Sequence, residues 1–79
     1  MTPERRSYIE KSIIRYIGGF GVDHSLSHQS MGLIGLAEMN RNISRTEFVE
    51  VLKGMKGVVL DTSGDIYMVR VPTKYFSEI

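Results

Sequence analysis

The spacing of apolar residues changes at Gly57, and this change constrains the fold more than any other feature of the sequence. Before Gly57, apolar residues recur every three or four positions, which is the period of amphipathic helices. After it, the runs 58–60 and 66–71 are rich in β-branched and aromatic residues, as strands are. The sequence therefore predicts a single α+β domain over residues 1–79, in which three helices precede a two-stranded β-hairpin.

The first predicted helix covers residues 2–17. Thr2 is a suitable N-cap, and Pro3 fits the first helical position because its missing N–H would have no partner there. One apolar stripe follows, made of Ile9, Ile13, Tyr16 and Ile17. Gly18 and Gly19 come next and are expected to end the helix.

The second predicted helix covers residues 28–39, where apolar residues are dense. Ser27 or Ser30 would supply its N-cap. Gly32 and Gly35 lie inside it, and each costs a helix up to about 1 kcal/mol relative to Ala. We expect at least one of these glycines to lie where another backbone packs closely.

The third predicted helix covers residues 45–56 and has the clearest start signal. Ser44 and Glu47 have the spacing of a capping box, in which each side chain satisfies the other residue's backbone N–H. A stripe of apolar residues at helical spacing follows: Phe48, Val51, Leu52 and Met55. Gly57 is expected to end the helix.

The predicted hairpin covers residues 58–71, with turn-forming residues at 61–65. Its second strand is apolar on both faces, whereas a two-layer domain buries only one face of a hairpin. Either the tail, residues 72–79, folds back over the hairpin, or a second copy covers it in a homodimer, which the pattern slightly favours. The expected dimer or partner surface comprises Ile66, Met68, Tyr75, Phe76 and Ile79.

Composition limits the classes of function. The chain of 79 residues has no cysteine, a formal net charge of +1 and no apolar run near the 20 or so residues that cross a bilayer. The N-terminus does not lead into a signal-peptide stretch, because Glu10 and Lys11 interrupt it. We therefore expect a cytoplasmic protein without a membrane partner.

No catalytic or cofactor-binding constellation is visible. No serine lies in a strand-to-helix elbow, and no glycine-rich loop follows a predicted strand. His24 and His28 have helical metal-ligand spacing, but Asp23 is the only carboxylate near them. We therefore expect no enzyme activity, no metal site and no cofactor.

The segment from Leu33 to Val69 resembles the winged helix-turn-helix family. The resemblance rests on Leu36-Ala37, a short turn, Ile43-Ser44-Arg45, Phe48, Val51-Leu52 and the hairpin, and with the first helix it covers about 70 residues. It implies a non-catalytic regulator of transcription that places the 45–56 helix in the major groove of double-stranded DNA and its wing on the adjacent backbone. By position in the motif, the nucleic-acid-binding residues would be Asn42, Ser44, Arg45, Thr46, Val49 and Lys53.

Several charges favour the alternative, a protein-binding module that modulates or inhibits a partner protein. Glu50 lies in the middle of the expected DNA-binding face, and the wing tip, residues 61–65, carries two carboxylates and no cation. The net charge is also low for a protein that neutralises phosphates. Lys11 and Arg15, on the first helix, hint at an anionic partner elsewhere, although a solvated helix face is the simpler interpretation.

Overall fold

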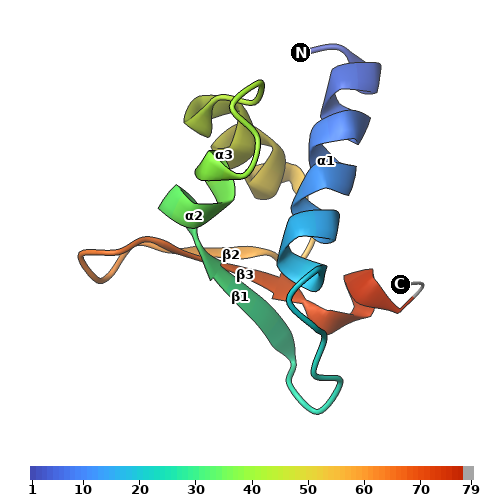
Figure 1. Ribbon diagram of the computed structural model, residues 1–79, viewed down its shortest axis with the longest axis vertical. Coiled ribbons are helices and arrows are strands. Elements are labelled where there is room, and N and C mark those ends of the chain that lie inside the picture. Colours follow the sequence, from blue (N-terminus) through green and yellow to red (C-terminus); the bar gives the residue numbers. More distant parts are fainter. Residues whose placement is uncertain (78–79) are drawn as a thin grey trace.

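The computed structural model describes residues 1–77 as a mixed α+β fold, with three α-helices above one face of a three-stranded antiparallel sheet (Figure 1). In chain order the elements are α1 (Pro3–Gly18), β1 (His28–Gly32), α2 (Leu33–Glu38), α3 (Arg45–Gly54), β2 (Val59–Asp61), β3 (Met68–Pro72) and the 3₁₀ helix η1 (Thr73–Phe76).

α1 begins where its local chemistry predicts. The Thr2 side chain accepts a hydrogen bond from the Arg5 N–H at 3.1 Å, and Pro3 occupies the first helical position. The helix buries Ile9, Ile13 and Ile17 on one side and ends at Gly18. This burial fixes α1 against the sheet and α3, and its opposite side faces solvent.

The predicted helix over residues 28–39 is wrong in its first part. Residues 28–32 form β1, and α2 covers only residues 33–38. Neither Ser27 nor Ser30 caps it; the N-cap is Gly32, which has no side chain to accept a hydrogen bond. β1 forms here because β3 has a second edge whose backbone groups need hydrogen-bonding partners.

The sheet has three strands, in the order β1-β3-β2, where the sequence predicted two. β3 is central, with Met31 opposite Val69 on one side and Leu60 opposite Val69 on the other. The hairpin is shorter than predicted, because Asp61 pairs with Met68 and residues 62–67 form its loop. Residues 62–67 are called the wing loop below.

α3 ends at Gly54, two residues before the predicted end. The chain turns at Gly57, whose φ of +82° lies in the left-handed region that favours glycine. A Cβ atom at Gly57 would lie 2.9 Å from the Cγ atom of Pro72. Gly57 therefore allows β2 to start close to the end of β3.

The core lies between the helices and the inner face of the sheet. α3 contributes Phe48, which is fully buried, and β3 contributes Val69 and Val71. Phe76 on η1 is 1% exposed and packs in the same cluster. The described part of the tail therefore packs with the helices on the inner face of the sheet and adds to the core there. The outer face of the hairpin is not covered by it, and covering by a second copy stays a prediction.

No helix within residues 1–77 combines the length and apolar character needed to cross a membrane.

Candidate nucleic-acid interface

The solvent face of α3 carries most of the residues predicted to bind nucleic acid. Arg45, Thr46 and Lys53 are exposed, and Val49 is half-buried beside them. Glu50 is also exposed on this face. The opposite side of α3 holds Phe48, Val51 and Leu52 in the core, so the exposed side chains are presented by a helix that cannot rotate.

The N-terminus of α3 is fixed by the predicted capping box. Ser44 Oγ accepts from the Glu47 N–H at 3.1 Å, and Glu47 Oε1 accepts from the Ser44 N–H at 3.0 Å. Arg5 of α1 donates from Nε to Glu47 Oε2 at 2.9 Å and from a terminal nitrogen to Oε1 at 3.1 Å. These hydrogen bonds, that from Arg5 first, lower the pKa of Glu47 to about 2. Glu47 is thus charged and committed to holding α3 against α1.

The turn before α3 is also tied to α1. The Asn40 side-chain amide donates to the phenol oxygens of Tyr8, at 2.6 Å, and Tyr16, at 3.0 Å. Arg5 donates to the backbone carbonyl of Asn42 at 2.5 Å. Asn42 is exposed, but its backbone is engaged, as is the hydroxyl of the capping Ser44. Both predicted site residues therefore help to position α3.

A surface cleft of about 240 Å³ separates α3 from the wing loop. Leu33 and Ile34 of α2 line it, together with Arg45, Asp65 and Tyr67. The Leu33 N–H donates to the Tyr67 carbonyl at 2.8 Å, which ties the wing loop to the start of α2. Arg45 thus lines the same cleft as the carboxylate of Asp65.

The two carboxylates of the wing tip have different surroundings. Asp61 accepts from the N–H and the hydroxyl of Ser63, at 3.0 and 2.6 Å, and pairs with Arg70 at 3.4 Å. The hydrogen bonds from Ser63 first, and then Arg70, lower the pKa of Asp61. Asp65 is exposed and has no ion-pair partner among residues 1–77. The free negative charge of the loop therefore resides on Asp65.

The residues predicted as a dimer or partner surface do not form one patch. Ile66 is 63% exposed and Met68 is half-buried, whereas Phe76 is in the core. Tyr75 is half-buried and its hydroxyl donates to the Lys56 carbonyl at 2.8 Å. Phe76 and Tyr75 are used inside the fold because η1 turns them towards it, and Ile79 lies outside the described residues.

Two residues of the site were missed by the sequence analysis. Arg5 orients α3 through Glu47, but the two are 42 positions apart and no local signal links them. Tyr67 was predicted only as part of the strand-like run 66–71, but it is 48% exposed and lines the cleft. Strand alternation does not extend to Tyr67 because β3 begins at Met68.

The two histidines lie apart from this interface. His24 is exposed in the connector, and His28 is half-buried at the start of β1, where its ring Nδ1 is 2.9 Å from the Ser27 hydroxyl. Because residue 28 is in a strand, the pair does not have the helical spacing considered above. Across residues 1–77, no three His, Cys, Asp or Glu side chains gather in a way that could hold a metal ion.

Comparisons of the chain with protein-family models, curated proteins and solved structures gave no significant match. What the interface binds has to be inferred from its own geometry and charges.

Proposed function

We propose that this chain is a non-catalytic nucleic-acid-binding protein that places α3 in the major groove of double-stranded DNA. The observation that carries the proposal is the solvent face of α3, where Arg45, Thr46 and Lys53 are exposed on a helix anchored along its other side. A regulator of transcription in the cytoplasm, built as a winged helix-turn-helix, is the role that fits this proposal.

Rigidity supports this proposal. A helix that reads base edges must enter the groove in a fixed orientation, because a displaced side chain loses its hydrogen bond. The capping box and the Arg5–Glu47 ion pair hold the N-terminal turn of α3, which is the part expected to approach the bases. The arrangement of α2, a short turn and α3 also supports it.

Each exposed side chain on α3 has a possible role at DNA. Arg45 can donate two hydrogen bonds to guanine or hold a phosphate, and Lys53 can hold a phosphate. Glu50 repels phosphates but can accept from the amino group of cytosine. Only two cations contribute to phosphate binding on α3 itself, so we expect modest general affinity and a shallow dependence on salt.

A fluorescence-anisotropy titration against mixed-sequence duplex DNA tests the proposal. With two phosphate contacts, affinity should fall about tenfold between roughly 50 and 200 mM salt, since each contact contributes about 0.9 to the logarithmic slope. Arg45→Glu should weaken binding at roughly 50 mM salt and reduce this fall to about threefold. Lys74→Glu, on the exposed side of η1, is the control of equal charge change.

If the folded wild-type protein does not bind the duplex at the lower salt concentration, the proposal is overturned. Equal losses in Arg45→Glu and Lys74→Glu would also count against it, because net charge alone would then explain the affinity.

A second candidate function, binding to a partner protein, is supported by the apolar rim of the cleft. Ile34 and Tyr67, which line a hollow that a partner's side chain could fill, are 51% and 48% exposed, and Ile66, next to Tyr67 in the chain, is 63% exposed. Under this function Ile66→Asp should abolish capture of the partner while Arg45→Glu leaves it largely intact. Phe76 is unsuitable for this test, because a charge there would unfold the core.

A further inference from the structure

The outward side of α1 carries two cations that the proposed function does not use. Lys11 and Arg15 are exposed, lie one helical turn apart and repel each other. The ion pairs within residues 1–77 join Arg5 to Glu47 and Arg70 to Asp61, so neither cation has an acidic partner there.

The same side of α1 is hollowed along its length. Three adjoining depressions, all lined by Lys11, run from Pro3 to Gly19, a span of about 24 Å at the helical rise. The one nearest the C-terminus of the helix has a volume of about 360 Å³ and an almost wholly apolar lining: Lys11, Ile14, Arg15, Gly18 and Gly19. These depressions are called the α1 groove. The other two depressions are also lined by polar residues, Glu4 among them, so the apolar hollow of the groove is the part beside Ile14, between Lys11 and Arg15.

The wing loop has the complementary chemistry. Asp65 is an exposed carboxylate without an ion-pair partner in the described chain, and Ile66 beside it is 63% exposed. Residues 61–65 contain no cation that would repel Lys11 or Arg15. The tip of the hairpin therefore offers one negative charge next to one apolar side chain, and the α1 groove offers positive charges next to an apolar hollow.

We propose that the wing loop of one copy of this chain docks in the α1 groove of a second copy. Asp65 lies between Lys11 and Arg15, and Ile66 enters the hollow beside Ile14. Each association relieves the repulsion between the two cations and covers an exposed isoleucine. The contact does not depend on nucleic acid, because it uses neither Arg45 nor Lys53.

The position of the two surfaces determines the kind of assembly. The wing loop and α1 lie at opposite ends of the molecule (Figure 1), so two copies that share one such contact leave one loop and one groove free. Contacts between unlike surfaces of this kind add copies head to tail. The account therefore predicts an open series of copies rather than a two-fold dimer.

The contact is small, since a loop tip enters a single groove. Such contacts fall below the size of stable interfaces, so association should appear at high protein concentration and weaken with salt. Sedimentation equilibrium without nucleic acid is the measurement, at concentrations up to about 1 mM and at roughly 50 mM salt. Wild-type mass should rise with concentration and pass that of a dimer.

Two complementary variants make the test specific. Lys11→Glu with Arg15→Glu destroys the groove but leaves the loop, and Asp65→Lys destroys the loop but leaves the groove. Each variant alone should remain monomeric, and circular dichroism should match the wild type because all three side chains are exposed. Mixed in equal amounts, they should form a dimer that grows no further, since the intact loop of the first variant fits the intact groove of the second.

Four outcomes would overturn the proposal. If the wild-type protein is monomeric at about 1 mM, the wing loop does not bind the groove, and the partner of the groove is a different, acidic molecule. Wild-type growth that stops at two copies indicates a two-fold dimer. Variants that associate singly like the wild type, or folded variants that do not associate when mixed, show that Asp65 and the two cations do not meet.

Discussion

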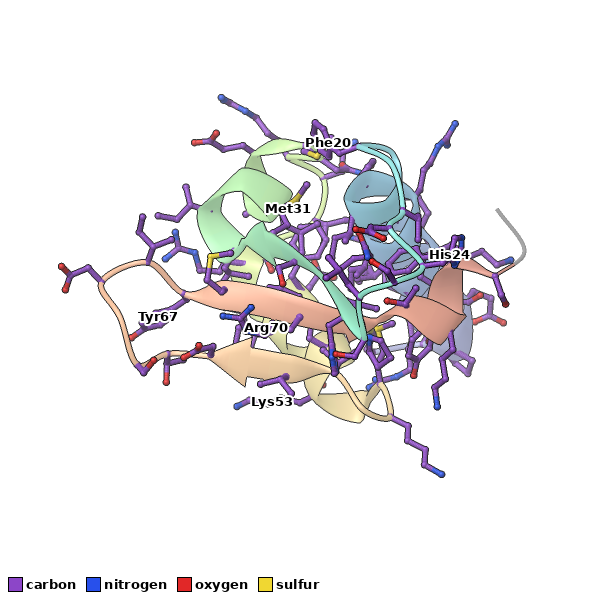
Figure 2. All side chains as sticks on the ribbon, turned by 90° about the horizontal axis from the view of Figure 1, so that it is seen from below. Phe20, His24, Met31, Lys53, Tyr67 and Arg70 are labelled. Carbon is purple, nitrogen blue, oxygen red and sulfur yellow. The ribbon has the colours of Figure 1, made fainter. Side chains whose placement is uncertain are left out.

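α3 and the wing loop lie on either side of one cleft, but they are held in place very differently. α3 is fixed by three buried side chains, a capping box and an ion pair to α1. The wing loop is held by the hydrogen bonds between Asp61 and Ser63 and by one backbone bond from Leu33. Figure 2 shows the sheet from below, with Tyr67 in the loop and Arg70 at the centre of the uncovered face.

The charges of the two regions differ in the same way. α3 exposes Arg45 and Lys53, whereas the wing loop exposes Asp65 and no cation. A wing with this charge is unsuited to the DNA backbone. The comparison indicates that, in the proposed complex, α3 would supply both the orientation and the phosphate contacts, and the wing loop would remain available for a different partner.

The largest expected difference between α3 and the wing loop is in stability, because their apolar side chains differ in burial. Phe48→Ala should lower the free energy of unfolding by about 3–5 kcal/mol, because it leaves a cavity in the core. Ile66→Ala in the wing loop should change it by less than about 0.5 kcal/mol, because that side chain is mostly exposed. Chemical denaturation followed by circular dichroism measures both. Similar losses of unfolding free energy in the two variants would contradict the difference described between α3 and the wing loop.

The next effect concerns two serines whose hydroxyls each form a hydrogen bond to a residue two or three positions away: that of Ser44 accepts from a backbone N–H, and that of Ser63 donates to a carboxylate. Ser44→Ala should cost about 0.5–2 kcal/mol, because it removes the N-cap of α3. Ser63→Ala, which removes a hydroxyl bound to Asp61 in the wing loop, should cost less than about 0.5 kcal/mol. Thermal melts of the two variants compare them directly. Equal destabilisation would mean that the loop contributes as much to stability as the cap.

Acid should loosen the attachment of α3 through Glu47. Its pKa is about 2 in the folded protein against 4.5 as the ordinary value, so the unfolded chain takes up the proton first as the pH falls. The contribution of Glu47 is complete above about pH 4.5 and is lost progressively towards pH 2. Stability measured from pH 6 to 2 should fall less steeply in Glu47→Gln than in the wild type, and parallel curves would contradict this role.

The smallest effect concerns the charge of the wing loop. Asp65→Lys removes the carboxylate from the cleft that Arg45 lines and places a cation there, where it could reach a DNA phosphate beside α3. Affinity for duplex DNA should rise several-fold, and its fall between roughly 50 and 200 mM salt should steepen from about tenfold to about 40-fold. The anisotropy titration, run with dilute protein, measures the affinity at both salt concentrations. An unchanged salt dependence would mean that the loop does not approach the DNA.

The features that could be predicted from sequence are those set by neighbouring residues. Thr2 and the Ser44–Glu47 pair fix helix starts through contacts only three residues long, and the stripe containing Phe48 defines the buried side of α3. The exposed residues on the opposite side follow from the same periodicity. That is why the face that holds Arg45 was predictable from the sequence.

The features that could not be predicted depend on distant partners. β1 pairs Ser30 with Arg70, 40 positions away, and residues 28–32, whose only large apolar side chain is Met31, carry no strand pattern of their own. Burial of Phe76 likewise depends on how η1 turns back onto α1. The cleft between α3 and the wing loop follows from the start of β3 at Met68, which local periodicity did not locate.

Chemical-shift mapping by NMR, with ¹⁵N-labelled protein and short duplex DNA, tests the central claim most directly because it reports where the DNA lies. The account predicts that the largest shifts occur at residues 45–53, centred on Arg45, Thr46 and Lys53, with few along the outward side of α1. Shifts concentrated instead at Lys11 and Arg15, or no shifts at protein and DNA concentrations near 1 mM, would contradict the assignment of α3 as the nucleic-acid-binding surface.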